Sequence, residues 1–166
     1  MNNSAPRIGH GYDIHRLKSG GTLVVGGVMV AHDLGVIAHS DGDVAIHALV
    51  DAILGALGAG DIGEMFPPSD PQWKNAASRI FLDGVMAKVR QAGLTIGNVD
   101  LTVLAERPRL APFRTEICST LAVLMHCDKS AVNVKAGTNE GCDCIGEGKA
   151  IAAHAVVILL PAGQPE

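Results

Sequence analysis

The sequence predicts an α/β (α+β) fold: one domain over residues 1–166, in which helices cover a mixed β-sheet. A chain of 166 residues has the size of one ordinary domain and can bury roughly 70% of its unfolded surface. Its residues are 48% hydrophobic and 18% charged, which is typical of a folded chain with an aliphatic core. The apolar spacing also changes repeatedly between that of strands and that of helices, without a linker or an internal repeat.

The spacing predicts the element order β-β-α-α-β-α-β-β. Residues 7–17 alternate as an extended segment, and residues 22–30 read as a strand with a bulge or close backbone approach at Gly26-Gly27. A helix follows, with Ser40 or Asp41 as its expected N-cap, and ends within residues 55–60. The later elements are a loop at 61–71, a helix at 75–91, a strand at 98–106, a helix at 113–125, a strand at 130–136, a Gly-rich loop at 137–148 and a strand at 150–160, with frayed ends at 1–6 and 161–166.

Composition excludes several classes of protein. Aromatic residues make up 3% of the chain and its net charge is −4, which argues against binding of DNA or RNA. No apolar run reaches the roughly 18 residues of a membrane span. Residues 1–6 resemble neither a signal peptide nor a transit peptide, so we expect a cytoplasmic protein. The four cysteines have no CxxC spacing and are expected to be reduced thiols.

Asp13 and His15 form the first candidate metal site. In an extended segment, residues two apart project from the same face, so this carboxylate and imidazole can converge on one divalent ion. The alternative is a surface aspartate that is hydrogen-bonded to a neighbouring histidine.

A second group lies on the helix that follows residue 40. Asp43, His47 and Asp51 share one face at helical spacing, and residues 40–60 contain neither Lys nor Glu. Such a helix is mostly buried, so its polar side chains need partners, unless this face is simply solvated. His47 would complete a two-histidine, one-carboxylate set with an open position, for which Zn²⁺ is the first choice. Asp43 or Asp51 would then orient the imidazole.

Two loops suggest phosphate and base recognition. In KAGTNEG, residues 135–141, backbone N–H groups and Thr138 can cradle a phosphate, and Glu140 suits Mg²⁺. In AERPRLAP, residues 105–112, two prolines restrict the backbone, whose exposed amides could contact a base edge. The alternatives are a polar loop after an edge strand and an ordinary turn before a helix.

Together these stretches resemble the 2-C-methyl-D-erythritol 2,4-cyclodiphosphate synthases of the non-mevalonate pathway of isoprenoid (terpenoid) biosynthesis. The resemblance rests on GHGYDIH, AHSDGDVAIHALVDAILGALGAGDIG, FPPSDPQWKNAASR, TVLAERPRLAP and NVKAGTNE, and it runs almost end to end. It implies a homotrimer with active sites between neighbouring subunits. It also implies a phosphorus–oxygen lyase: the 2-phosphate of 4-diphosphocytidyl-2-C-methyl-D-erythritol 2-phosphate attacks the β-phosphorus, the 2,4-cyclodiphosphate forms, and CMP leaves.

The resemblance also implies roles for individual residues. Asp13, His15 and His47 would bind Zn²⁺, or else Mn²⁺ or Mg²⁺, and Glu140 would bind Mg²⁺ or Mn²⁺ together with substrate phosphates. His39 and Thr138 would stabilise the transition state. The substrate residues would be Asp13, His15, His39, Ser40, Asp61, Ile62, Gly63, Phe66, Pro67, Pro68, Ser69 and Asp70. The cytidine residues would be Ala105, Glu106, Arg107, Pro108, Arg109, Leu110, Ala111, Ala136, Gly137 and Thr138, from the adjacent subunit. Lys74, Ser78 and Arg79 match the motif but are left outside the predicted site.

The chain departs from the family pattern in CDCIGEGK, residues 142–149. Cys144 stands where Phe is usual, Glu147 where Arg is usual, and Lys149 where Glu is usual. In the family, that Phe and Arg line a cavity on the trimer axis, which can hold an isoprenoid diphosphate. A ring of three Glu147 carboxylates would repel a diphosphate, so we expect the cavity not to bind one. The alternative is that Glu147 and Lys149 form the same structural ion pair with its charges exchanged.

Two other functions fit part of the pattern. One is a catalytically silent trimeric protein that binds a metal or a nucleotide and keeps the fold. The other is a zinc-dependent phosphohydrolase that uses the same triad, with Asp43 or Asp61 as its general base.

Overall fold

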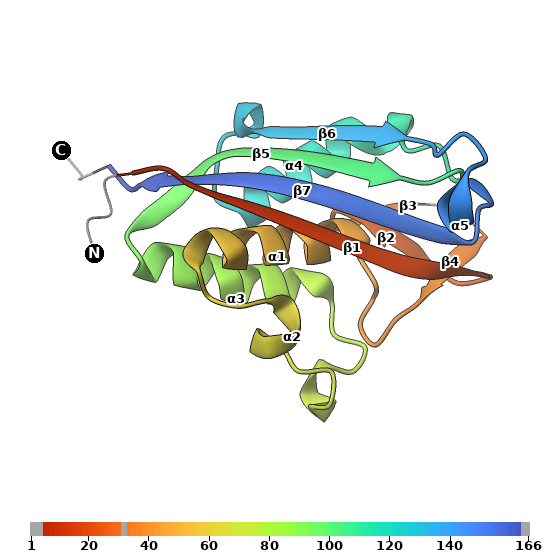
Figure 1. The fold of residues 1–166 in the computed structure, drawn as a ribbon, viewed down its shortest axis with the longest axis horizontal. Helices are drawn as coiled ribbons and strands as arrows, with labels where there is room; N and C mark the ends of the chain where they lie inside the picture. Colours follow the sequence, from red (N-terminus) through yellow and green to blue (C-terminus); the bar gives the residue numbers. More distant parts are fainter. Residues whose placement is uncertain (1–4, 31–32, 164–166) are drawn as a thin grey trace.

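A five-stranded mixed sheet forms the body of the protein (Figure 1). The computed structural model describes residues 5–30 and 33–163. The strand order is β4-β1-β7-β5-β6; β5 and β6 are parallel, and the other neighbours are antiparallel. The strands are β1 (Arg7–Ser19), β4 (Leu34–Ile37), β5 (Leu94–Leu104), β6 (Val132–Gly137) and β7 (Ala150–Pro161). The predicted mixed sheet is thus confirmed.

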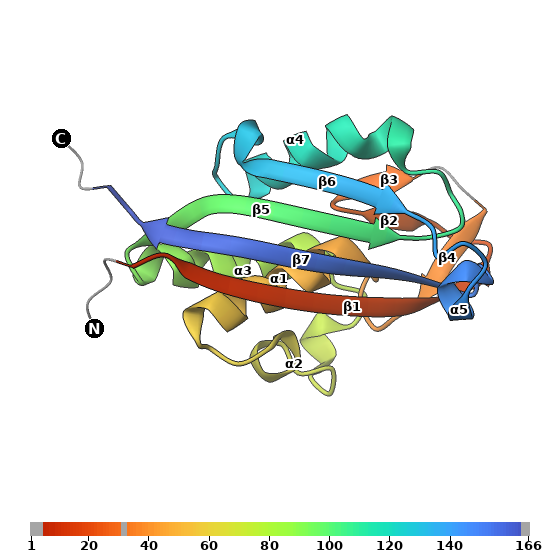
Figure 2. The same cartoon turned by 45° about the horizontal axis from the view of Figure 1, so that its top comes forward.

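Three helices cover one face of this sheet, and the other face is largely open (Figures 1 and 2). They are α1 (Val44–Leu57), α3 (Ser78–Gln91) and α4 (Arg114–Leu124). The core between the helices and the sheet is aliphatic, as the composition predicts. The short elements are α2 (Ile62–Met65), α5 (Asp143–Gly146) and the 3₁₀ turns η1 (Pro71–Trp73), η2 (Ala111–Phe113) and η3 (Lys129–Ala131). No helix among the described residues has the length and apolar character needed to cross a membrane.

Glycines on β1 bring α1 unusually close to the sheet. A Cβ added at Gly9 would collide with the backbone of Ala52, and one at Gly11 with the backbone of Ala48. The helix therefore rests directly on the strand, with alanines at the contact. This close packing carries His47 of α1 to the inner face of β1.

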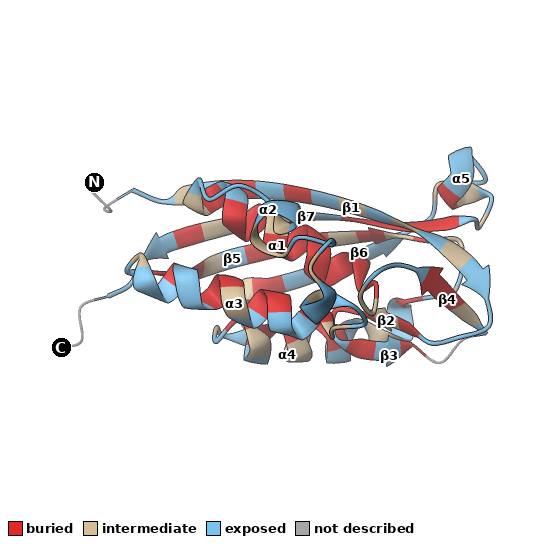
Figure 3. Ribbon diagram, turned by 90° about the horizontal axis from the view of Figure 1, so that it is seen from below, coloured by how far each residue is buried: buried red, intermediate tan, exposed pale blue. Residues whose placement is uncertain are grey.

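The outer face of β1 and β7 carries exposed apolar side chains. Ile8 is 70% exposed, Tyr12 44%, Ile14 40% and Val156 39%. Figure 3 shows buried and exposed residues alternating along these strands, with α5 on the side of the sheet away from the large helices. Only near α5 is the outer face covered among the described residues, where Ile145 packs in a small cluster with Ala152. The rest of this face is left open in a single chain.

The region expected as one strand at residues 22–30 is instead a hairpin, so that prediction was wrong. Strands β2 (Leu23–Val25) and β3 (Val28–Val30) pair as a separate two-stranded sheet. Gly26 and Gly27 have φ values of 60° and 77°, which suit a two-residue hairpin turn in which both residues are left-handed. The glycine pair therefore marked a reversal of the chain and not a bulge.

Several element boundaries also differ from the prediction. Strand β4 was missed because its LGVI is too short to show a period. Strand β5 begins at Leu94, and its register shifts between Ile96 and Asn98. Helix α3 begins at Ser78 because residues 71–73 form a 3₁₀ turn, Asn75 has a φ of 60° and Ala77 is extended. Of the ends expected to fray, residues 1–4 and 164–166 lie outside the described residues, and β7 continues to Pro161.

Candidate active site

Asp13, His15 and His47 converge where β1 meets α1. The Oδ2 atom of Asp13 lies 2.9 Å from His15 Nε2 and 3.0 Å from His47 Nδ1. The two imidazole nitrogens are 3.0 Å apart. Tetrahedral coordination with bonds of 2.0–2.1 Å places ligand atoms about 3.3 Å from one another. The three side chains could therefore hold one metal ion with little rearrangement.

The Asp13 carboxyl is held in its ionised form. Burial raises its pKa, but hydrogen bonds with His15 and His47 and the charges of these rings outweigh burial and hold the pKa well below its usual range. An ionised carboxylate is the form that binds a cation. The side chains of Asp13 and His15 are 23% and 16% exposed, so the group is open on one side only.

Two serines contact the far nitrogen of His47. Ser78 Oγ lies 2.9 Å from His47 Nε2, and Ser40 Oγ lies 3.1 Å from it. The Ser78 hydroxyl donates to Asp41 Oδ1, and the Ser78 amide donates to Asp41 Oδ2 at 2.9 Å. If Nδ1 binds a metal, Nε2 carries the ring proton. The Nε2–H group can then donate a hydrogen bond to Ser78 Oγ, while the Ser78 hydroxyl donates to Asp41. These two hydrogen bonds fix the tautomer and the orientation of the His47 ring.

Asp43 does not orient His47, so that prediction was wrong. Asp43 is completely buried and is the N-cap of α1, which also corrects the expected cap at Ser40 or Asp41. Its carboxylate accepts the amides of Gly26 at 2.8 Å, Gly27 at 2.6 Å, and Ala45 and Ile46 at 3.1 Å each. Burial raises its pKa against the opposing effect of these hydrogen bonds. Asp43 thus ties the glycine hairpin to the helix.

Asp51 does not orient His47 either. Its Oδ1 accepts the amide of Ile62 at 2.7 Å and so links α1 to the start of α2. Burial raises the pKa of this carboxyl, and the Ile62 hydrogen bond lowers it. The residues that do hold the ring, Ser78 and Asp41, were not predicted in this role. Ser78 had one usable signal, its match to the family motif.

A pocket of about 300 Å³ opens beside the triad. Its walls come from β1, β4, α1, α2, η1 and α3. Of the predicted substrate residues, six besides those of the triad lie in these walls: His39, Ser40, Ile62, Gly63, Phe66 and Pro68. The rest of the lining is His15, Ile37, Ala38, His47, Trp73 and Phe81.

Besides Asp13 of the triad, four predicted substrate residues lie outside this lining. Asp61 Oδ1 accepts the amide of Glu64 at 2.8 Å, and Asp70 Oδ1 accepts the amide of Gln72 at 3.0 Å. These carboxylates cap α2 and η1 and so shape the loop. Pro67 and Ser69 are exposed in the same loop.

Three aromatic rings form the inner wall of the pocket. The ring centroid of Phe66 lies 5.2 Å from that of Trp73 and 4.8 Å from that of Phe81. The indole Nε1 of Trp73 is buried and has no hydrogen-bond partner within the described part of the chain. Sequence reasoning missed Trp73 and Phe81 as pocket residues because their apolar character predicts the core equally well.

The predicted cytidine residues gather at the other edge of the sheet. A pocket of about 320 Å³ is lined by Ala105, Glu106, Pro108, Arg109, Leu110, Ala111, Ala136, Gly137 and Thr138. Only Arg107 of the predicted set is missing from this lining. The pocket lies between the end of β5 and the end of β6, where two parallel strands point the same way.

Thr138 and Glu140 contact each other but not the triad. Thr138 Oγ1 donates to Glu140 Oε1 at 2.8 Å, and both residues are exposed. Strand β6 is three places from β1 in the sheet, a spacing of roughly 14 Å. The two pockets share no lining residue. One chain therefore holds the two halves of the predicted site apart.

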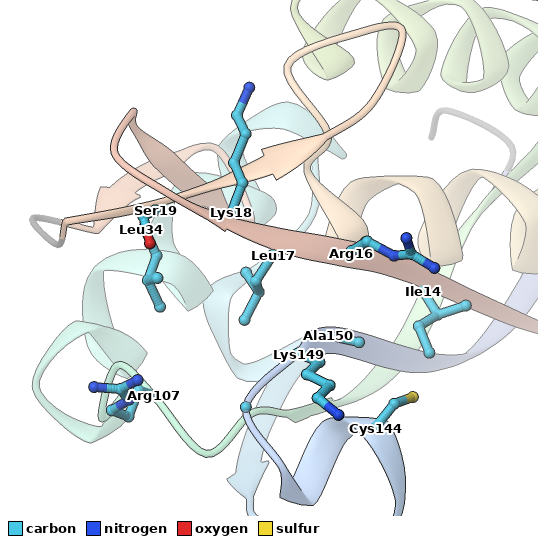
Figure 4. Close-up of a pocket in the computed structure, with 11 residues that line it drawn as sticks. Ile14, Arg16, Leu17, Lys18, Ser19, Leu34, Arg107, Cys144, Lys149 and Ala150 are labelled. Atoms are coloured by element: carbon cyan, nitrogen blue, oxygen red, sulfur yellow. The ribbon is translucent and has the colours of Figure 1, made fainter.

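Figure 4 shows a third cavity, near the end of β1 and the start of β7. Its volume is about 590 Å³, and Cys144 and Lys149 are in its wall. Lys149 Nζ lies 2.5 Å from Glu147 Oε2, so the residues whose charges are exchanged relative to the family form an ion pair within one chain. Glu147 does not line the cavity. The other lining residues are Ile14, Arg16, Leu17, Lys18, Ser19, Leu34, Arg107, Gly148 and Ala150.

Comparison with known proteins identifies the family. The family model described as "YgbB family" matches residues 6–160. The chain belongs to the YgbB family. A relative in this family, the chloroplastic 2-C-methyl-D-erythritol 2,4-cyclodiphosphate synthase of Arabidopsis thaliana, is 51% identical over 93% of this chain and 67% of its own length. The corresponding synthase of Photobacterium profundum is 46% identical over 92% of this chain and 98% of its own length.

Solved structures of similar proteins have the same fold. IspF of Plasmodium falciparum, described as a CDP complex, superposes on this chain with a TM-score of 0.86 at 38% sequence identity. The superposition covers 98% of this chain and 100% of the IspF chain. The bifunctional IspDF of Campylobacter jejuni superposes with a TM-score of 0.90 at 39% sequence identity. The superposition covers 93% of this chain and 42% of the IspDF chain.

Proposed function

We propose that this chain cyclises 4-diphosphocytidyl-2-C-methyl-D-erythritol 2-phosphate to the 2,4-cyclodiphosphate and releases CMP, as an enzyme of isoprenoid precursor biosynthesis. The observation that carries the proposal is the Asp13–His15–His47 triad, whose ligand atoms lie 2.9–3.0 Å apart beside a pocket that His15 and His47 help to line. Membership of a family of synthases with this activity supports it.

The triad suits a divalent ion that polarises a phosphate. The donor set of two imidazoles and one carboxylate favours Zn²⁺, with Mn²⁺ or Mg²⁺ as alternatives. When bound, such an ion supplies Lewis-acid stabilisation of charge on the phosphoryl oxygens. His39, in the wall of the same pocket, can donate a hydrogen bond to those oxygens. The apolar wall of Phe66, Trp73 and Phe81 suits the carbon skeleton of the methylerythritol.

The second pocket suits the nucleotide end of the substrate. Its wall combines the backbone of residues 105–111 with Gly137 and Thr138. Successive N–H groups at the end of β6 can bind a phosphate. Glu140 would hold Mg²⁺ or Mn²⁺ together with substrate phosphates, and the Thr138 hydroxyl, which donates to Glu140 in the structure, would then turn to donate to the transferring group. The CDP complex of the Plasmodium falciparum relative supports a cytidine-type ligand.

The active unit that we infer is a homotrimer with its sites between subunits. The pocket beside the triad and the predicted cytidine pocket lie at opposite edges of one sheet. The two pockets of a single chain therefore cannot both contact the same substrate molecule. The outer sheet face, with Ile8, Tyr12, Ile14 and Val156 exposed, offers apolar area for contact between copies. Association would place the cytidine pocket of one chain next to the triad of its neighbour. A cytoplasmic location stays a prediction, since the Arabidopsis relative is named as chloroplastic.

A phosphohydrolase with the same triad lacks its expected general base. All of the contacts of the Asp43 carboxylate are to backbone amides in the core, and Asp61 caps α2 outside the pocket lining. The deciding experiment supplies the cytidyl diphosphate substrate with Mg²⁺ or Mn²⁺ and follows CMP release and the phosphorus NMR spectrum. We expect equimolar CMP and a cyclic diphosphate. A linear diphosphate would indicate a hydrolase, and no CMP release would indicate a silent binding protein.

A further inference from the structure

Two backbone hydrogen bonds join the stretch before α1 to the stretch before α3. The amide of Asn75 donates to the carbonyl oxygen of His39 at 2.7 Å, and the amide of Asp41 donates to that of Ala76 at 3.1 Å. The Asp41 carboxylate also accepts the amide of Ser78 at 2.9 Å and the Ser78 hydroxyl. The stretch before α1 is therefore bonded to the start of α3, which lies beside α1 (Figure 1).

The start of α3 contacts His47 in two ways. Ser78 Oγ lies 2.9 Å from His47 Nε2. Three residues further along α3, the ring centroid of Phe81 lies 6.0 Å from that of His47 and 5.8 Å from that of Trp73. Trp73 and Phe81 both line the pocket beside the triad. One metal ligand is thus linked to the aromatic wall of the pocket by a hydrogen bond and by ring packing.

The direction of these hydrogen bonds depends on Asp41. A carboxylate only accepts hydrogen bonds, so the Ser78 hydroxyl donates to Asp41 and offers a lone pair to the Nε2–H group of His47. The ring then has Nδ1, the nitrogen that faces Asp13, free to bind a metal. Asp41 itself is outside the pocket lining, so it would act through Ser78.

We propose that Asp41 is a positioning residue that couples metal binding at the triad to the packing of Trp73 in the pocket wall. A metal on Nδ1 fixes the His47 ring, and the ring contacts both Ser78 and Phe81. Such coupling is reciprocal, so a ligand that orders the wall should also strengthen metal binding. The inference rests on the metal site of the proposed function, but its contacts all lie within one chain and its test needs no substrate. The competing explanation is that Asp41 only holds two loops together beside a rigid wall.

The test titrates the metal-free wild type with Zn²⁺ and follows Trp73, the only tryptophan in the chain. Its indole N–H is buried, and its ring contacts those of Phe66 and Phe81, so the single indole nitrogen–proton resonance and the fluorescence emission both report on the wall. Both signals should shift as the triad fills, and neither should shift in His47→Ala.

The same titration separates failure of the coupling from failure of the metal site. Zn²⁺ binding to the triad with an unmoved Trp73 resonance would overturn the coupling and leave the metal site intact. A shift of equal size in His47→Ala would come from an ion elsewhere and would also overturn it. A wild type that binds no Zn²⁺ would refute the metal site, and with it both the coupling and the proposed function.

Asp41→Asn distinguishes positioning from loop support. The amide oxygen can accept the N–H or the hydroxyl of Ser78 but not both, and the NH₂ group can donate to Ser78 Oγ. The Ser78 hydroxyl would then donate to His47 Nε2, which leaves the proton on Nδ1, where a metal should bind. The Zn²⁺ affinity should fall about 10–100-fold, and the Trp73 shift should shrink even at saturating Zn²⁺.

Asp128→Asn is the matched control, because Asp128 caps η3 through the amide of Ser130 and should leave Zn²⁺ affinity and the Trp73 shift unchanged. Circular dichroism establishes that each variant folds. A folded Asp41→Asn protein with wild-type affinity and a full shift would overturn the proposal. Should Asp41→Asn not fold, Ser78→Ala breaks the same link and keeps the amide hydrogen bond, and a full Trp73 shift in that variant would be equally decisive against it.

Discussion

Ser78 Oγ lies 2.9 Å from Nε2 of His47, on the opposite edge of the ring from the nitrogen that faces Asp13. The same hydroxyl donates to Asp41, so its direction is fixed. A serine at the start of α3 therefore determines which nitrogen of His47 is free to bind a metal.

Ser78→Ala should weaken metal binding without unfolding the protein. Loss of the acceptor for Nε2–H frees the ring to rotate and to change tautomer, and the loss of such a partner typically costs about 10–100-fold in metal affinity. Ser40 still contacts Nε2, so the effect should fall toward the lower part of that range. A competition titration with a Zn²⁺ indicator measures it. Ser119→Ala, which loses only a hydrogen bond within α4, is the control, and equal affinities for the two variants would refute the role of Ser78.

Gly11→Ala should separate α1 from the sheet and disrupt the triad. The new Cβ would collide with the backbone of Ala48, so the helix must move and carry His47 away from Asp13. Overpacking of this kind costs roughly 1–3 kcal/mol or more of unfolding free energy. Urea unfolding and Zn²⁺ titration should both report a loss.

Gly55→Ala is the matched control for this change. Gly55 lies in α1 itself, and its added Cβ would meet only the backbone oxygen of His10, at 3.9 Å. The variant should be as stable as the wild type, or up to about 1 kcal/mol more stable. A Gly11→Ala protein that keeps wild-type stability and metal affinity would show that the close contact has no such function.

The Asp100–Lys135 ion pair should give a small pH-dependent contribution to stability. Lys135 Nζ lies 2.6 Å from Asp100 Oδ2, and this hydrogen bond lowers the pKa of the carboxyl. A lowered pKa in the folded state stabilises the protein above the unfolded pKa of about 3.9, and this stability is lost as pH falls through the folded value. Both side chains are about half exposed, at 50% and 41%, so we expect under about 1 kcal/mol.

Urea unfolding of wild type and Lys135→Met between pH 7 and pH 2.5 measures this contribution. The difference in unfolding free energy should be constant near neutral pH and should shrink below about pH 4. A difference that stays the same down to the lowest pH would mean that packing, not the charge pair, sets the effect of Lys135.

The exchanged charges at Glu147 and Lys149 should alter ligand binding at the axis of the proposed trimer. We expect the wild type not to bind an isoprenoid diphosphate there, because Glu147 stands where the family has Arg. The double variant Glu147→Arg/Lys149→Glu restores the charges of the family pattern, though not the Phe in place of Cys144, and should bind geranyl diphosphate in a calorimetric titration. Micromolar binding of geranyl diphosphate to the wild type would contradict this prediction. That result would favour a purely structural role for the Glu147–Lys149 ion pair, whose charged atoms lie 2.5 Å apart.

The sequence predicted the parts of this protein that are set by local pattern. The alternation around Asp13 and His15 placed both on one face of β1, and the lack of Lys and Glu in α1 indicated its burial. The family resemblance of the two loop motifs named nearly all of the residues that line the pocket at the ends of β5 and β6, and these residues are contiguous in two short segments.

Long-range contacts were not predictable in the same way. Asp43 and Asp51 share the His47 face of the helix, yet each binds backbone amides of a distant loop, from Gly26 and Gly27 and from Ile62. Helical spacing gives the direction of a side chain but not what stands opposite it. Ser78 contacts His47 only because α3 folds back beside α1, and no local signal encodes that contact.

Replacement of His47 by Ala tests the central claim most directly. The measurement is CMP release from the cytidyl diphosphate substrate by metal-reconstituted wild type and His47→Ala at equal protein concentration. Loss of a Lewis acid worth several kcal/mol should lower turnover by about 10³-fold or more. A folded His47→Ala enzyme with wild-type turnover would contradict the assignment of Asp13, His15 and His47 as the catalytic metal site.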